Sequence, residues 1–141
     1  MSTPATSKTT SRVSAQRPLS PFMIGPYYKP QMTSMLSITH RLTGLGLSFG
    51  AILLVVWLVC LASGVDRYNA IAPHLTAWYG KAVLVAFTWA LLYHFCNGIR
   101  HLMWDLGKGL DMPTAEKTGW GVIVFSIGLT AAVWAIALAT K

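Results

Sequence analysis

Charge is scarce in this chain, and acidic charge is scarcest. Only 11% of its 141 residues are Asp, Glu, Lys or Arg, and only four residues are acidic. An ordinary soluble domain has about 25% charged residues. Hydrophobic residues make up 54% of the sequence. This composition argues against a soluble globular domain and predicts a membrane protein.

Three long stretches contain no charged side chain at all, namely residues 42–63, 82–99 and 118–140. A helix needs about 20 mainly apolar residues to cross a bilayer. The sequence therefore predicts an all-α membrane protein with three transmembrane helices, over about 42–63, 82–103 and 118–140. No other stretch is long and apolar enough for a fourth, and no soluble region is large enough for an active site of its own.

The basic residues gather on one side of the predicted membrane. Five precede the first span and three lie between the second and third, whereas residues 64–81 hold two basic residues and one aspartate. Positive-inside bias then places the N-terminus in the cytoplasm, or in the matrix of a mitochondrion, and the C-terminus on the opposite side. The net charge of +7 is explained by this topology and indicates no nucleic-acid partner.

Cysteine and catalytic motifs are also scarce. Cys60 lies near the outer end of the first span and Cys96 toward the inner end of the second, so both are predicted to be free thiols. The sequence has no Gly-rich phosphate loop, no CxxC pair, no CxxCH motif for covalent haem and no nucleophile with a paired base. We therefore expect no reaction on a soluble substrate from this chain alone.

The segments outside the spans carry fewer signals. Residues 1–16 are predicted to be a disordered polar tail, although their Ser/Thr-rich, acid-free composition is also weakly typical of a transit peptide. Residues 17–36 include four prolines and are predicted to lie at the membrane interface or under a partner. In the outer loop, Pro73 is expected to break any helix. In the inner half of the first span, Gly44, Gly46 and Gly50 are expected to let another helix approach closely.

One ionisable side chain lies inside a predicted span. His94 is six residues, about 9 Å of helix rise, from Arg100, and an intramembrane histidine is a functional candidate. It is either a neutral side chain hydrogen-bonded to a neighbouring helix or a ligand of a metal or haem. Gly98, one turn further on, leaves room beside the ring for a flat macrocycle, which favours haem. A proton relay in a small transporter is a third interpretation.

Two other histidines fit the same iron less well. His101 is about 10.5 Å along the helix from His94, whereas two nitrogens on one iron are about 4 Å apart, by analogy with zinc–imidazole bonds. His101 is therefore predicted to belong to the polar rim, beside Asp105. His40 is predicted to lie about two turns shallower than His94, which argues against it as a second ligand.

A second polar cluster, Ser37 with Arg41, precedes the first apolar run. The two residues are one turn apart and share a face if the helix has begun there. An arginine with a hydroxyl at the inner boundary suits hydrogen bonding to a quinone carbonyl or pairing with haem propionates. The alternative is an ordinary snorkelling arginine next to a helix cap.

Taken together, three segments resemble a known family: "RPLSP" at 17–21, "SITHRLTG" at 37–44 and "HFCNGIRHLMWD" at 94–105. With three spans in this order, they resemble the cytochrome b, or large membrane-anchor, subunit of succinate dehydrogenase (respiratory complex II). The resemblance covers residues 17 to about 140.

The resemblance implies a role for each matching residue. His94 corresponds to an axial ligand of haem b, with the other ligand supplied by a second, smaller anchor subunit. Ser37 and Arg41 correspond to residues of the ubiquinone site, and His40 and Arg41 lie where the family approaches the haem propionates.

The resemblance also implies partners and a location. FAD and iron–sulfur clusters are expected only in the flavoprotein and iron–sulfur subunits, which residues 17–36 would help to dock on the anchor formed by residues 37–140. The expected location is the bacterial inner membrane, in preference to the mitochondrial one. The alternatives are a structural anchor without haem or quinone, or the anchor of a quinol:fumarate reductase.

Overall fold

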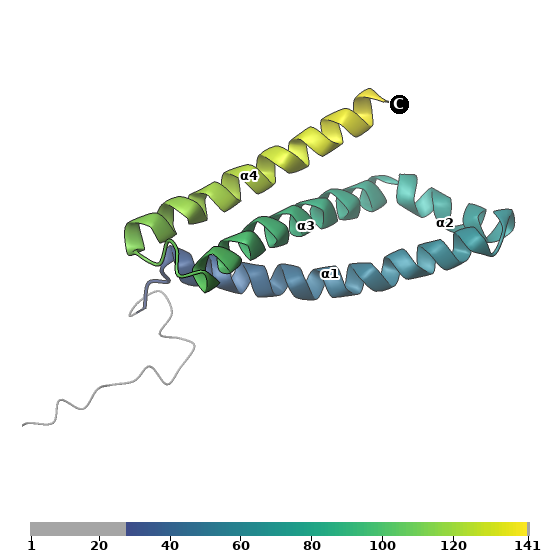
Figure 1. Cartoon of the computed structure of the whole chain (residues 1–141). Coiled ribbons are helices and arrows are strands. Elements are labelled where there is room, and N and C mark those ends of the chain that lie inside the picture. The colour runs from purple at the N-terminus through teal and green to yellow at the C-terminus, as the bar shows by residue number, and fades with distance from the viewer. Residues whose placement is uncertain (1–27, 141) are drawn as a thin grey trace, which may run out of the picture. The chain divides into compact units, whose positions relative to one another are not determined.

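A computed structural model describes residues 28–140 of the chain. Residues Gln31–Lys141 form one compact unit. Its long helices are α1 (Met32–Ala62), α3 (Trp78–Asp105) and α4 (Met112–Ala139), and a short helix α2 (Val65–Thr76) connects α1 to α3 (Figure 1). All three long helices are apolar enough to cross a membrane. The predicted all-α class and the three spans are confirmed.

Helix α1 begins at Met32, ten residues before the charge-free run. Polar residues extend the helix because Ser, Thr, His and Arg cost little in a helix outside the apolar part of a span. The cluster around Ser37 and Arg41 is therefore helical. The predicted tail, 1–16, and most of the predicted docking segment lie outside the described residues.

The connection from α3 to α4 is a tight reversal. Gly107 and Gly109 both have φ of +72°, a conformation that L side chains rarely adopt. Asp111 then caps α4, since its carboxylate accepts a hydrogen bond from the Thr114 N–H at 3.0 Å. Hydrogen bonds from the side chain and backbone of Thr114 lower the pKa of Asp111. As predicted from the short connection, α3 and α4 are antiparallel neighbours (Figure 1).

Helix α3 packs against both other long helices, and the three meet in a small core. Leu36 of α1, Tyr93 of α3 and Val122 of α4 are buried together. The Tyr93 hydroxyl donates a hydrogen bond to the Leu36 carbonyl at 3.1 Å. This core lies next to His94 in the sequence of α3, so it fixes the rotation of α3 about its axis at that level.

Two of the three glycines predicted to let another helix approach α1 do contact α3. A Cβ at Gly50 would lie 1.6 Å from the Phe87 ring, and one at Gly44 would lie 2.9 Å from His94 Cε1. A Cβ at Gly46 would meet nothing within 4 Å. The prediction is therefore confirmed for Gly44 and Gly50 and wrong for Gly46, which lies two residues, or about 200° of helix rotation, from Gly44.

The connection between α1 and α3 corrects a second prediction. Pro73 lies inside α2, which continues to Thr76. Proline has no backbone N–H, so the helix loses one backbone hydrogen bond at Pro73. Because Pro73 lies in the last turn of α2, this single loss still allows three more helical residues. The end of α2 and the start of α3 approach each other closely at Gly80, where a Cβ would overlap the His74 carbonyl oxygen. Cys60 and Cys96 are free, as predicted.

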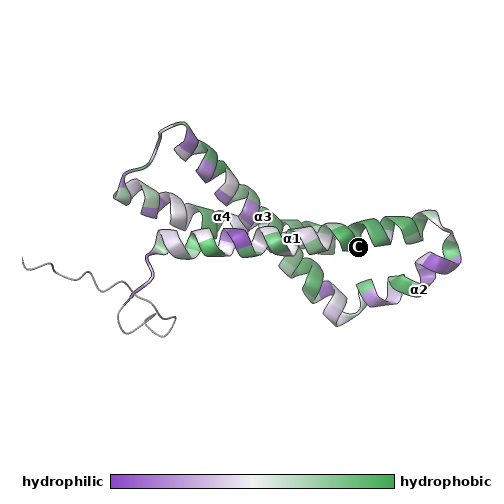
Figure 2. Ribbon diagram, turned by 90° about the horizontal axis from the view of Figure 1, so that it is seen from below, coloured by the Kyte–Doolittle hydropathy of each residue, from purple (hydrophilic) through white to green (hydrophobic). Residues whose placement is uncertain are grey.

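Hydropathy divides the molecule along the helices. In Figure 2 the middle of the long helices is hydrophobic, and hydrophilic residues gather near the α3–α4 connection and around α2. Most large apolar side chains are exposed, and only 6% of the most apolar window of α1 is buried. This surface is what helices present to lipid or to other membrane helices.

Candidate functional site

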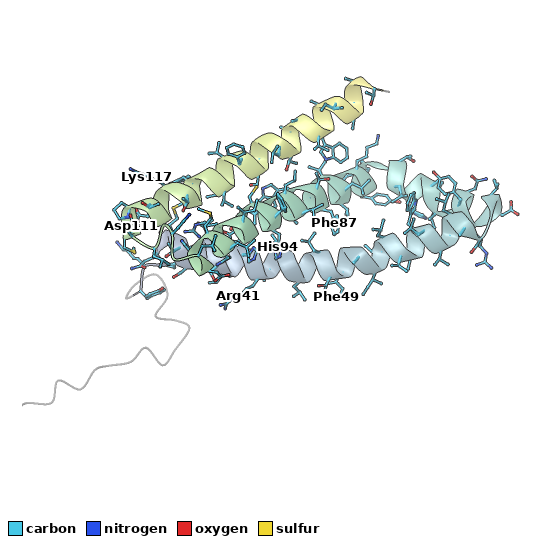
Figure 3. The ribbon with its side chains drawn as sticks, in the orientation of Figure 1. Arg41, Phe49, Phe87, His94, Asp111 and Lys117 are labelled. Carbon is cyan, nitrogen blue, oxygen red and sulfur yellow. The ribbon has the colours of Figure 1, made fainter. Side chains whose placement is uncertain are left out.

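His94 projects from α3 toward α1, where the α1 backbone holds its ring (Figure 3). Its Nδ1 lies 3.1 Å from the His40 carbonyl oxygen and 3.3 Å from the Thr43 hydroxyl. A carbonyl only accepts hydrogen bonds, so Nδ1 carries the hydrogen and donates it. The Nε2 atom is then the ring nitrogen with a free lone pair, which is the state in which a histidine ligates a metal.

His40 lies on the same level as His94, and this corrects the depth predicted for it. The two rings are stacked, with centroids 3.9 Å apart and planes 13° apart. The prediction measured depth from Arg41 and Arg100 as boundary residues, but Arg100 is buried in the bundle and does not mark a boundary. Stacked rings cannot ligate opposite sides of one iron, so His40 is still no second ligand for His94 in this arrangement.

His101 belongs to the same group of rings. Its centroid is 5.2 Å from that of His40, and its ring meets the edge of Trp104 at 5.1 Å. The structure thus gathers three histidines between the first turns of α1 and the last turns of α3. The Nδ1 atom of His40 is buried and has no hydrogen-bond partner in the described part of the chain. Most buried polar atoms have a hydrogen-bond partner, which can be a water or a bound group as well as a protein atom.

Arg41 faces away from this histidine group. It projects from the side of α1 that is turned away from α3 (Figure 3) and is exposed. Ser37, one turn earlier, is partly exposed. The structure therefore separates the residues of the "SITHR" segment by direction: His40 points into the bundle, while Arg41 points out of it.

The sequence analysis did not predict that Asn97 and Arg100 are buried. Asn97 is fully buried, and neither atom of its amide has a partner within residues 28–140. Arg100 is 5% exposed and donates hydrogen bonds to the Thr118 hydroxyl at 3.1 Å and the Ala115 carbonyl at 2.8 Å. The signal was present in the spacing, because Tyr93, Asn97 and Arg100 follow one another at four and three residues, the repeat of one helix face.

The residues around His94 fit an axial ligand of haem. Its Nδ1 is engaged, which leaves Nε2 for the iron, and Gly44 makes room for the ring. The position of Gly98 is open, since a Cβ there would meet nothing within 4 Å. Among the described residues no three His, Cys, Asp or Glu side chains form a metal site, but haem needs only one protein ligand on each side.

Comparison with known proteins decides the family. Residues 14–133 match the model of the succinate dehydrogenase/fumarate reductase transmembrane subunit. The chain belongs to this family. It is 45% identical to the succinate dehydrogenase cytochrome b556 subunit of Rickettsia typhi, over 84% of this chain and 91% of the relative.

More distant relatives come from a free-living bacterium and from a mitochondrion. The cytochrome b556 subunit of Paracoccus denitrificans is 34% identical over 80% of this chain and 85% of its own length. The mitochondrial cytochrome b560 subunit of Homo sapiens is 36% identical over 82% of this chain and 68% of its own length. This chain is thus a membrane subunit of a succinate dehydrogenase complex, and it works with other subunits.

Proposed function

We propose that this chain anchors a succinate:ubiquinone oxidoreductase in the bacterial inner membrane, supplies one axial ligand of haem b through His94 and forms part of the ubiquinone site. The flavoprotein and iron–sulfur subunits would carry FAD and the iron–sulfur clusters, and a smaller anchor subunit would supply the second haem ligand. The observation that carries this proposal is the hydrogen bond from His94 Nδ1 to the α1 backbone, which fixes the tautomer that a ligand needs.

On the haem side, α1 acts as a holder for the ligand of α3. The carbonyl of His40 and the hydroxyl of Thr43 orient the imidazole, and a backbone acceptor increases the basicity of Nε2. The unbonded Nδ1 of His40 is available to a haem propionate. Haem with two histidine ligands transfers electrons without an open position for oxygen.

On the quinone side, Arg41 and Ser37 supply donors at one helix face. A guanidinium and a hydroxyl one turn apart stabilise the negative charge that develops on a quinone oxygen during reduction. Since Arg41 projects away from His40, we assign it first to the quinone. Its predicted approach to the haem propionates stays a prediction.

The quinone assignment predicts that two activities separate. Replacing Arg41 or Ser37 with Ala should lower succinate:quinone reductase activity, by on the order of a hundredfold for the loss of one hydrogen-bond donor to the transition state. Succinate oxidation with a soluble artificial acceptor should stay at the wild-type rate, because the flavin and the clusters are untouched. Both activities are measured on the same purified complex.

The matched control is Arg67→Ala, which removes an arginine from the outer helix α2. This variant should leave both activities unchanged. Equal loss of both activities in Arg41→Ala would show failed assembly, whereas wild-type quinone reductase activity in an assembled Arg41→Ala complex would contradict the quinone role. A complex that reduces fumarate with quinol faster than it oxidises succinate would favour the second candidate, a quinol:fumarate reductase anchor, which the family description includes.

A further inference from the structure

A cavity of about 370 Å³ opens between the ends of α3 and α4 that meet at their tight connection. It is separate from the histidine group, and neither Ser37 nor Arg41 lines it. Two cations, Arg100 and Lys108, face it, and no carboxylate is among its lining residues. The cavity surface is mostly apolar, and the charged residues in its lining are both cations.

Hydrogen bonds and a contact with Trp104 fix the guanidinium of Arg100 in the cavity wall. Its two hydrogen bonds go to neutral acceptors on α4, and its guanidinium carbon lies 4.0 Å from the centre of the Trp104 ring. The indole is itself fixed, because Trp104 Nε1 donates to the Gly109 carbonyl at 3.0 Å. The hydrogen bonds use two of the five guanidinium donors. Arg100 is 5% exposed, and burying a cation is costly unless an anion is paired with it.

The rest of the cavity is apolar. Cys96, Ile99 and Val122 line it on the side toward the middle of the spans, while Lys108 lies in the exposed connection. The cavity wall thus combines one exposed and one buried cation with apolar side chains toward the middle of the spans. A free inorganic anion uses only the cations, whereas a phospholipid also uses the apolar side chains.

We propose that this cavity binds an anionic phospholipid of the inner leaflet. Its phosphodiester lies between Arg100 and Lys108, and the start of one acyl chain lies against Ile99 and Val122. Basic pockets between transmembrane helices on the cytoplasmic side suit anionic headgroups. The site requires neither haem nor quinone, so it stands independently of the proposed function.

The test is native mass spectrometry of the delipidated complex, titrated with phosphatidylglycerol. Phosphatidylcholine serves as the neutral lipid and inorganic phosphate as the anion without chains. Lys108→Ala should weaken phosphatidylglycerol binding about fivefold, the effect of one lysine at an anionic membrane surface. Lys108→Glu should weaken it further. Lys108 is exposed, so both variants should assemble normally.

The control is Lys117→Ala, which removes an exposed lysine of α4 that does not line the cavity. It should leave the affinity unchanged. Three results would overturn the proposal: equal binding of the two lipids, equal weakening by Lys117→Ala and Lys108→Ala, or no effect of Lys108→Ala. Full displacement of the lipid by millimolar phosphate would also overturn it, because the apolar wall would then contribute nothing.

Discussion

At the scale of single residues, the state of His94 depends on what α1 places around its ring. The His40 carbonyl accepts from Nδ1, the Thr43 hydroxyl supports it, and Gly44 leaves the space in which the ring lies. None of these neighbours would touch iron. They act by holding the imidazole in one tautomer and one position, and losing such support typically costs ten- to a hundredfold in metal affinity.

Gly44→Ala tests this support directly. The new methyl group would lie 2.9 Å from His94 Cε1, so the ring must shift by a few tenths of an ångström. We expect haem affinity to fall by on the order of tenfold and the haem reduction potential to change. Both are measured on the purified complex, as the haem-to-protein ratio and by redox titration.

Gly46→Ala is the matched control, because it adds the same methyl group to the same helix where nothing lies within 4 Å. Its haem content and potential should match the wild type. If Gly44→Ala also matched the wild type in both measurements, the holding role of α1 would be refuted.

At the scale of elements, the contact between α1 and α3 depends on two glycine positions. Gly44 accommodates His94, and Gly50 accommodates the ring of Phe87, which Figure 3 shows between the two helices. These contacts are six residues apart on α1, so together they set both the distance and the register of α3.

Gly50→Ala should destabilise the complex, because its methyl group overlaps the Phe87 ring. Overpacking of this kind costs about 1–3 kcal/mol, and thermal unfolding of the complex should begin at a lower temperature. The double variant Gly50→Ala with Phe87→Leu should recover most of the loss, since the smaller side chain leaves room. This account of the packing would be contradicted if the double variant unfolded at the same temperature as Gly50→Ala. It would also be contradicted if Gly46→Ala lowered the unfolding temperature as much as Gly50→Ala.

The elements were predictable where one physical constraint dominates. A charge-free run of about 20 residues has few alternatives to a span, and all three runs became helices. The start of α1 at Met32 was not predictable from such runs, because six of its first ten residues are polar. The stacking of His40 on His94 was missed for a related reason: depth was inferred from charged residues, and one of them, Arg100, is buried.

At the scale of the whole molecule, the chain presents most of its apolar surface outward. The buried core is small and lies where α1, α3 and α4 meet. A membrane subunit of this kind has its remaining helix faces available for lipid and for neighbouring subunits. The fully buried amide of Asn97, without a partner in the described chain, is the one core feature for which we have no physical account.

Orientation in the membrane is a prediction from charge, and cysteine labelling tests it. With Cys60 and Cys96 replaced by serine, a single cysteine is introduced at Ser63 or at Lys108. A membrane-impermeant maleimide should label Ser63→Cys in intact spheroplasts and Lys108→Cys only after permeabilisation. The reverse pattern would invert the topology and place the proposed quinone site on the wrong side of the membrane.

The central claim is that His94 ligates haem b, and a reduced-minus-oxidised spectrum of the purified complex tests it most directly. The wild type should show a b-type α band, and His94→Ala should lose the band or greatly reduce it. His74→Ala, which removes the exposed histidine hydrogen-bonded to Tyr79, should keep it. Absence of the band in the wild type, or an unchanged band in His94→Ala, would contradict the claim.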